Sequence, residues 1–230
     1  MATPLTDAIN ALTAYANETT GASDTTLSDA VESLVAGYSG GGGWSADGII
    51  AGTEPSGAIT SIATTACFGA LAGNSAITSL YLPLLETVNE RSFNAMSALT
   101  SFVAPKMTYT QNYLFAGSTS LKTIDILGAA LLGYRSAIAN NSFENCHAFD
   151  TMIIRNTSEL MRINHINAFN NTPFRGYNSL TGTLYVPQAQ LANYQADAQW
   201  KTLYDAGTMI ILPIEGSIYE TQYADGTPIT

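Results

Sequence analysis

The most regular feature of the chain is a pattern of apolar and polar positions that returns from about Ile59 onward. The apolar residues that open the expected strands are separated by 22, 22 and 28 residues: Ile77, Leu99, Leu121 and Phe149. A phenylalanine follows at a similar interval: Phe68, Phe93, Phe115, Phe143 and Phe169. Such a period is typical of repeat proteins in which each unit is one short strand, a turn and an irregular or helical return. The pattern therefore predicts an α/β repeat solenoid with short parallel strands over residues 58–187.

Within each expected strand, residues alternate between the two faces of the sheet. One set should face the core: Leu80, Leu82, Phe102, Ala104, Ile124, Ile126, Met152, Ile154, Leu184 and Val186. Two sets should face outward: Tyr81, Val103, Asp125, Ile153 and Tyr185, and the hydroxyl residues Ser79, Ser101, Thr123, Thr151 and Thr183. Pro83, Pro105 and Pro187 should close three of the strands, because proline cannot donate the next ladder hydrogen bond.

The first 38 residues show the spacing of two short amphipathic helices. Their apolar positions include Leu5, Ile9 and Leu12 in the first helix and Leu27, Val31 and Leu34 in the second. Helices of about 12 residues are marginal alone in water, so these stripes need a partner surface. We expect this segment to serve in anchoring or oligomerisation. Residues 39–57, which include four consecutive glycines at positions 40–43, form the expected linker.

The pattern changes again over residues 188–230. The apolar residues Leu191, Tyr194, Trp200 and Leu203 lie in a region of helical character, which predicts a cap over the last coil. The stretch "TMIILPI" predicts a final strand. The remaining residues, 215–230, form a C-terminal tail with two tyrosines and an Asp-Gly turn. Two interpretations of this tail stay open: a small hairpin, or an arm that reaches a neighbouring molecule.

Composition and charge exclude several classes of function. The 230 residues include 18 acidic and only 8 basic side chains, for a formal net charge of −10, and no basic residue precedes Arg91. Nucleic-acid binding needs a basic stripe, and none is visible. The start of the chain lacks the features of a signal peptide, and the longest apolar run is too short to span a bilayer. We therefore expect assembly in a cytoplasm, no nucleic-acid partner and no membrane insertion.

The sequence offers little material for catalysis or for a metal site. The two histidines, His147 and His165, fall on different coils, and no Cys/His pair has metal-ligand spacing. Cys67 and Cys146 are expected to be small buried apolar residues. We expect no catalytic residues, no metal and no cofactor. Two surfaces could bind a partner: the outward strand face formed by Tyr81, Val103, Asp125, Ile153 and Tyr185, and the return loops rich in Asn, Ser, Thr and Tyr.

The stretches "LTSFVAPKMTYTQNYLFAGSTSLKTIDI" and "NNSFENCHAFDTMII" resemble BspA-type leucine-rich repeats, in which a Leu-Thr-Ser strand ends at a proline and is followed by a phenylalanine and a small loop. Cys146, three residues after Phe143, matches the loop cysteine of that family. The closing "GTLYVPQAQLANYQADAQW" is similar to the terminal segment of such proteins from phages and prophages, and the helical leader is similar to those of phage structural proteins. The resemblance covers residues 58–207 and implies a right-handed solenoid with a binding role and no catalysis.

The resemblance leads to a functional expectation. The chain is expected to be a virion protein, a fibre or decoration in the head or tail, that displays its solenoid for host adhesion. Expected partners are other virion proteins, further copies of the chain in a homo-oligomer such as a trimer, and a host cell-surface glycan or protein. Two alternatives stay open: a virion scaffold or decoration protein that binds no receptor, and a bacterial cell-surface adhesin.

Overall fold

The computed structural model of the chain describes residues 60–61, 66–67, 71–128 and 137–229. All of them belong to one compact unit, Pro55–Thr230. The two expected N-terminal helices, with Leu5, Ile9, Leu12, Leu27, Val31 and Leu34, and the glycine-rich linker lie outside the described residues. Their predicted anchoring role stays a prediction.

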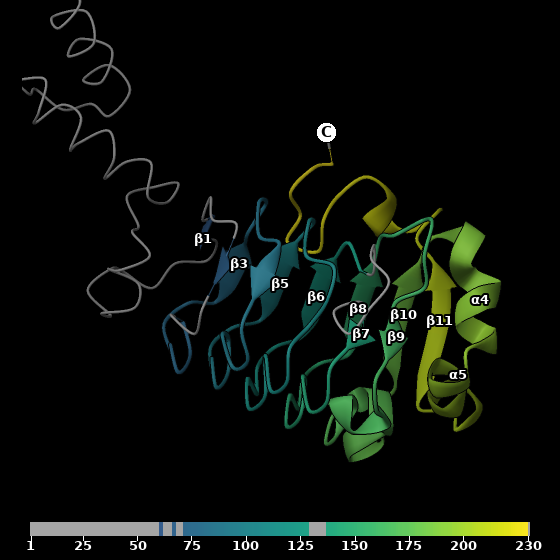
Figure 1. The fold of residues 1–230 in the computed structure, drawn as a ribbon, viewed down its shortest axis with the longest axis horizontal. Coiled ribbons are helices and arrows are strands. Elements are labelled where there is room, and N and C mark those ends of the chain that lie inside the picture. Colours follow the sequence, from purple (N-terminus) through teal and green to yellow (C-terminus); the bar gives the residue numbers. More distant parts are fainter. Residues whose placement is uncertain (1–59, 62–65, 68–70, 129–136, 230) are drawn as a thin grey trace, which may run out of the picture. The chain divides into compact units, whose positions relative to one another are not determined.

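A parallel sheet of seven strands organises the described part of the chain (Figure 1). Its strands are β1 (Thr60–Ser61), β3 (Ser79–Tyr81), β5 (Ser101–Ala104), β6 (Thr123–Ile126), β8 (Thr151–Ile154), β10 (Gly182–Val186) and β11 (Met209–Pro213). They lie in the sheet in the same order as in the sequence. The fold is therefore α/β-like, with a parallel sheet and few helices, as the period of the sequence predicted.

The register of the strands follows the repeat of the sequence. Equivalent residues of successive strands are direct partners, as in the hydroxyl row Ser79, Ser101, Thr123, Thr151 and Thr183. The core-facing set that alternation predicted is at most 1% exposed throughout, which confirms that assignment. The chain leaves the sheet directly before Pro105 and Pro187, and one residue before Pro83.

The phenylalanines of the return segments form a stack behind the sheet. Phe93, Phe115, Phe143 and Phe169 are all completely buried. Their ring centroids are 5.4, 5.5 and 5.4 Å apart from one residue to the next, with nearly parallel planes. This offset geometry favours aromatic pairs beyond the area they bury. One phenylalanine per return segment thus continues the core from strand to strand, as predicted for these four residues.

Two small parallel sheets accompany the main one. Strand β2 (Ala66–Cys67) pairs with β4 (Thr87–Val88), and β7 (Ala137–Ile138) pairs with β9 (Arg162–Ile163). The return after β9 contains the short 3₁₀ helices η1 (Ile166–Phe169), η2 (Pro173–Arg175) and η3 (Tyr177–Ser179).

A short helical segment, the cap, lies in the region for which the sequence predicted one. It consists of η4 (Gln188–Gln190), α4 (Leu191–Ala196) and α5 (Ala198–Asp205), followed by β11 at the end of the sheet. Tyr194 and Trp200 are fully buried, and both bind the backbone of Met161: the Tyr194 hydroxyl accepts from its N–H at 3.0 Å, and Trp200 Nε1 donates to its carbonyl at 2.7 Å. These bonds satisfy the polar ends of two large side chains and fix the cap on the last return segment.

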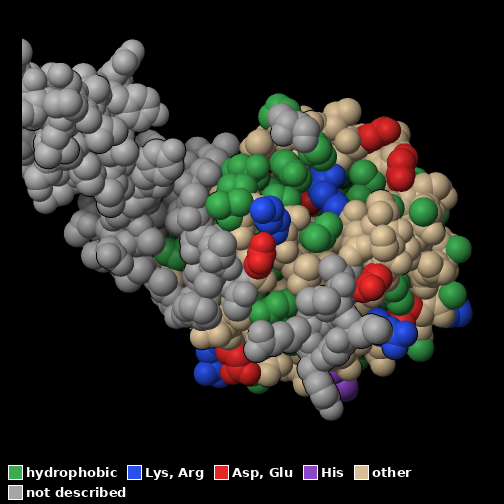
Figure 2. All heavy atoms as spheres, turned by 45° about the horizontal axis from the view of Figure 1, so that its top comes forward, with side chains coloured by type: hydrophobic (Ala, Val, Ile, Leu, Met, Phe, Trp, Pro, Cys, Tyr) green, Lys and Arg blue, Asp and Glu red, His purple; other side chains and the backbone are tan. Residues whose placement is uncertain are grey.

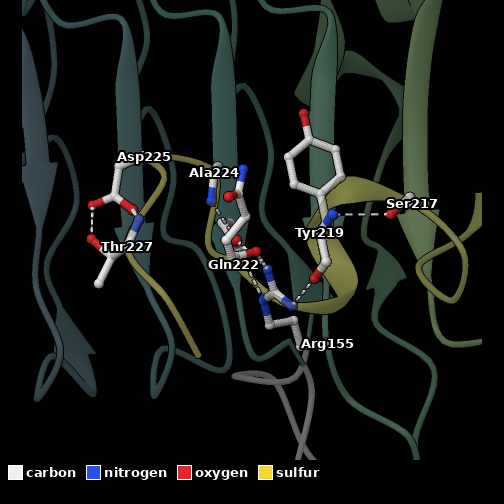
Figure 3. Close-up of polar contacts among 8 residues, drawn as sticks. Arg155, Ser217, Tyr219, Gln222, Ala224, Asp225 and Thr227 are labelled. Atoms are coloured by element: carbon white, nitrogen blue, oxygen red, sulfur yellow. Dashed lines mark hydrogen bonds and ion pairs between the residues drawn. The ribbon is translucent and has the colours of Figure 1, made fainter. Parts of the chain in front are cut away.

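The C-terminal tail forms a small hairpin, one of the two interpretations that the sequence left open. It begins with η5 (Ile218–Glu220) and closes through an antiparallel bridge between Gln222 and Pro228. Within the turn, the N–H of Tyr223 donates to the carbonyl of Thr227 at 2.8 Å. Figure 3 shows this tail crossing in front of the strands of the main sheet.

Candidate functional site

The outward strand face predicted from alternation is a real row of neighbours. Tyr81, Val103, Asp125, Ile153 and Tyr185 are register partners on five adjacent strands. Their expected exposure is wrong for the middle of the row, because Val103, Asp125 and Ile153 are 0% exposed. Only the two tyrosines at its ends are half-buried. The reason is tertiary: the C-terminal tail packs on this face, which alternation alone cannot reveal.

A buried ion pair lies in the centre of this face. Arg155 follows directly after β8, and its guanidinium grips the carboxylate of Asp125 on the neighbouring strand with two bonds of 2.6 Å, from Nε to Oδ1 and from Nη2 to Oδ2. The side chain of Arg155 is 13% exposed and that of Asp125 is 0% exposed. A bidentate guanidinium–carboxylate pair is among the strongest and most directional polar contacts in proteins. These two bonds and the positive charge offset the free-energy cost of burying the carboxylate.

The same pair binds the backbone of the tail (Figure 3). Arg155 Nη1 donates to the carbonyl of Tyr219 at 2.9 Å, and Nη2 donates to that of Gln222 at 3.0 Å. Asp125 Oδ2 accepts from the N–H of Ala224 at 3.0 Å. The guanidinium carbon also lies 4.9 Å from the ring centroid of Tyr223. The ion pair therefore recognises two carbonyls and one N–H of a turn, with a ring stacked on the cation.

Aromatic contacts hold the tail at both ends of the row. The ring of Tyr223 lies 5.9 Å from that of Tyr81, and the ring of Tyr219 lies 4.8 Å from that of Tyr185 in an edge-on arrangement. Burial raises the pKa of Tyr219, and the nearby Tyr185 adds to the increase. The tail is thus fixed at three points: a tyrosine pair at each end and the ion pair between them.

The electrostatics of Asp125 depend on its partners. Burial raises the pKa of this carboxyl, while the hydrogen bonds and charge of Arg155, together with the N–H of Ala224, oppose the increase. Burial is the largest of these contributions, since water is excluded from the carboxylate. Loss of Arg155 would therefore leave a carboxyl that strongly favours its neutral form.

Sequence reasoning found Asp125 and the two outer tyrosines but missed Arg155, Tyr219 and Tyr223. One signal was present: Asp125 is an acidic residue in the middle of an apolar strand, and a charge in such a position requires a partner. Arg155 lies two residues beyond Ile153, the register partner of Asp125 on the adjacent strand, so the strand pairing could have identified it. The tail residues could not be found in this way, since about 65 residues separate them from Arg155.

A second candidate site lies on the return loops near the C-terminal end of the repeats. An open depression of about 300 Å³ is lined by Asn170, Asn171, Arg175 and Tyr177. Arg175 donates to the side chain of Asn170, and Asn171 Nδ2 donates to Asn145 Oδ1 at 2.7 Å. The ring of Tyr177 stacks on that of His147 with centroids 4.5 Å apart. These loops were expected to be rich in adaptable polar groups, but the depression itself depends on how the return segments stack.

The other residues whose side chains could take part in chemistry make structural contacts. Cys146 is fully buried as predicted, its Sγ lies 3.1 Å from the carbonyl of Phe115, and burial raises the pKa of its thiol. His165 Nδ1 accepts from the N–H of Asn167 and caps η1. Across the described ranges, no group of His, Cys, Asp and Glu side chains could hold a metal ion. No described helix is long and apolar enough to cross a membrane.

Comparison of the chain with protein-family models, with curated proteins and with solved structures finds no match.

Proposed function

We propose that the chain is a BspA-type leucine-rich repeat protein of a bacteriophage virion, in which a solenoid displays a host-binding surface. The observation that supports this proposal best is the row from Ser79 to Thr183, in which one residue of each of five adjacent strands, β3 to β10, pairs with its equivalent in the next. Together with the phenylalanine stack, this row fits units that are buried mainly by their neighbours. Repeats of this kind create extended surfaces for binding.

The depression on the return loops is the surface best suited to a host glycan. Asn170 and Asn171 offer amide groups that can donate hydrogen bonds to hydroxyls and accept hydrogen bonds from them, and Arg175 offers guanidinium N–H donors. Tyr177 adds an aromatic body with a polar tip. The face of the molecule seen in Figure 2, which includes the tail, carries scattered acidic and basic side chains among apolar and polar ones. Several copies on one particle would strengthen a weak contact through avidity.

Binding of the full-length chain to intact bacterial cells tests the proposal. The R175A/Y177A variant should lose most of the binding, and periodate treatment of the cells, which destroys glycans, should have the same effect on the wild-type chain. K201A/Y204A is the matched control, because both residues are exposed on α5 and neither lines the depression. Equal binding by R175A/Y177A and by the wild type would rule out the depression as the receptor site.

A second function, a virion protein that contacts only neighbouring subunits, is favoured by one specific observation. Ile210 and Leu212 of β11 are 45% and 37% exposed, and they continue the outward face at the end of the sheet. Adjacent exposed apolar residues of this kind often lie in protein interfaces. If I210T/L212T falls off purified particles while cell binding by the isolated chain is absent throughout, the scaffold function is the better explanation.

A further inference from the structure

The two sides of the contact between the tail and the strand face differ in how deeply their residues are buried. On the sheet, Val103, Asp125 and Ile153 are completely buried. In the tail, over residues 215–229, every residue is half-buried or exposed. The three central side chains of the face are thus fully buried beneath the tail, whereas no side chain of the tail is itself fully buried in this contact. Segments with little buried apolar surface are those that open locally at low cost.

The tail also has internal contacts that do not depend on the sheet. Ser217 Oγ accepts from the N–H of Tyr219, and Asp225 accepts from both the N–H and the hydroxyl of Thr227. The N–H of Ile229 donates to the carbonyl of Thr221 at 3.0 Å. The tail therefore holds a turn shape that matches the ion pair, and a preorganised segment loses less entropy on binding.

The connection to the rest of the chain is suited to a hinge. Glu215 and Gly216 are exposed, and Gly216 has a φ of +80° with open space around its α-carbon. The last buried residue before it is Ile214. A rotation at Gly216 would break the hydrogen bonds that the N–H and the hydroxyl of Ser217 donate to the carbonyl of Ile214, at 3.0 and 2.6 Å, but it would carry the tail away and leave β11 and the cap in place.

From these observations we propose that the strand face is a peptide-binding site whose ligand is the C-terminal tail, docked in cis in this structure and exchangeable with the tail of a second copy. The recognition elements are the guanidinium of Arg155, the carboxylate of Asp125 and the rings of Tyr81 and Tyr185. The ligand is a turn that presents two carbonyls, one N–H and two tyrosines. Every copy of the chain carries both halves of this contact, so exchange between neighbours forms the same bonds and links the copies.

This inference goes beyond host binding, and it does not depend on the depression on the return loops. A tail in cis competes at an effective concentration in the millimolar range, so exchange is favoured where copies are held close together. The proposed virion is such a setting, because neighbouring subunits would keep the second tail within reach.

Complementary full-length variants provide the test. Y219A/Y223A weakens the tail but leaves the face intact, and R155K weakens the face but leaves the tail intact. Lysine keeps the charge of Arg155 but cannot form the bidentate fork. In a mixture of the two, the intact tail of one chain should occupy the intact face of the other. Energy transfer between a donor on one variant and an acceptor on the other should exceed that of either same-variant mixture by several-fold.

A peptide comprising residues 216–230 provides a second readout. The labelled peptide should bind the Y219A/Y223A chain about tenfold more tightly than the wild type, whose face is already occupied. A peptide with both tyrosines replaced by alanine is the matched control and should not bind. Because R155K could disturb folding, Y81A/Y185A serves as a second face variant, since both rings are half-buried and lie outside the core.

Each result of the energy-transfer and peptide-binding experiments either supports or overturns the proposed exchange of tails. Energy transfer confined to the complementary pair, together with tyrosine-dependent peptide binding, supports the proposal. Equal energy transfer in all mixtures, or a peptide that fails to bind the Y219A/Y223A chain, overturns it. Neither readout involves host cells, so a failure here is distinct from a failure of the proposed host-binding function.

Discussion

The buried ion pair between Arg155 and Asp125 makes a strong prediction about stability. The variant R155M removes two bonds of 2.6 Å from a carboxylate that is 0% exposed, and it leaves that carboxylate with the N–H of Ala224 as its remaining partner. Removal of one member of a buried pair typically costs about 3 to 5 kcal/mol. The tail carbonyls that Arg155 also binds belong to half-buried residues, so water can replace those bonds. We therefore expect the free energy of unfolding to fall by about 3 to 5 kcal/mol.

The size of the loss should depend on pH. Burial already raises the pKa of Asp125, and Arg155 opposes that increase, so R155M raises the pKa further. A carboxyl with a raised native pKa binds its proton more tightly in the folded state. Its contribution to stability is therefore present at low pH and is lost as the pH rises through the native pKa. The difference between R155M and the wild type should be smaller at about pH 5 than at about pH 8.

Urea unfolding followed by tryptophan fluorescence gives the free energies at both pH values, provided the slope with denaturant stays constant. K201M is the matched control: Lys201 and its partner Asp205 are 51% and 55% exposed, so it should lose less than about 0.5 kcal/mol. The double variant D125L/R155M, with an apolar pair in place of the ions, should recover most of the loss. A loss below about 1 kcal/mol for R155M, or an equal loss at both pH values, would refute this reasoning.

Three further predictions concern the core. F143A should lose about 3 to 5 kcal/mol of unfolding free energy, because Phe143 is fully buried in the aromatic stack. The control L180A, at a residue that is 50% exposed, should lose under about 0.5 kcal/mol. Similar melting temperatures for the two variants would contradict the stacked core. In G182A the new methyl group would lie 2.6 to 2.8 Å from ring atoms of Phe174, so urea unfolding should show that the free energy of unfolding falls by about 1 to 3 kcal/mol. The second substitution F174L should partly restore it, and a double variant that is no more stable than G182A would argue against this contact. Cys146, in a chain whose other cysteine is replaced by serine, should react with a thiol reagent only under unfolding conditions, and rapid labelling of the folded chain would show that its burial is wrong.

The sequence by itself determined the repeating part of the fold. Strand spacing, alternation and the position of Pro105 and Pro187 are local signals, and a parallel sheet built from successive units converts them directly into register. The helical cap was equally visible, because the apolar residues Leu191 and Tyr194, and likewise Trp200 and Leu203, are three positions apart after β10. These features depend on contacts between segments that follow one another in the repeat, so the order of residues along the chain is enough to predict them.

Only the tertiary structure decided which face of the sheet is open. Alternation places Val103, Asp125 and Ile153 on the face away from the core, but it cannot tell whether that face meets solvent or another segment. The segment that covers it is the tail, and the contact between Ala224 and Asp125 joins residues 99 positions apart. Such a contact depends on the length and path of everything between its ends, including the cap and β11. A periodic pattern describes neighbours well, but a single long-range docking event leaves no period in the sequence.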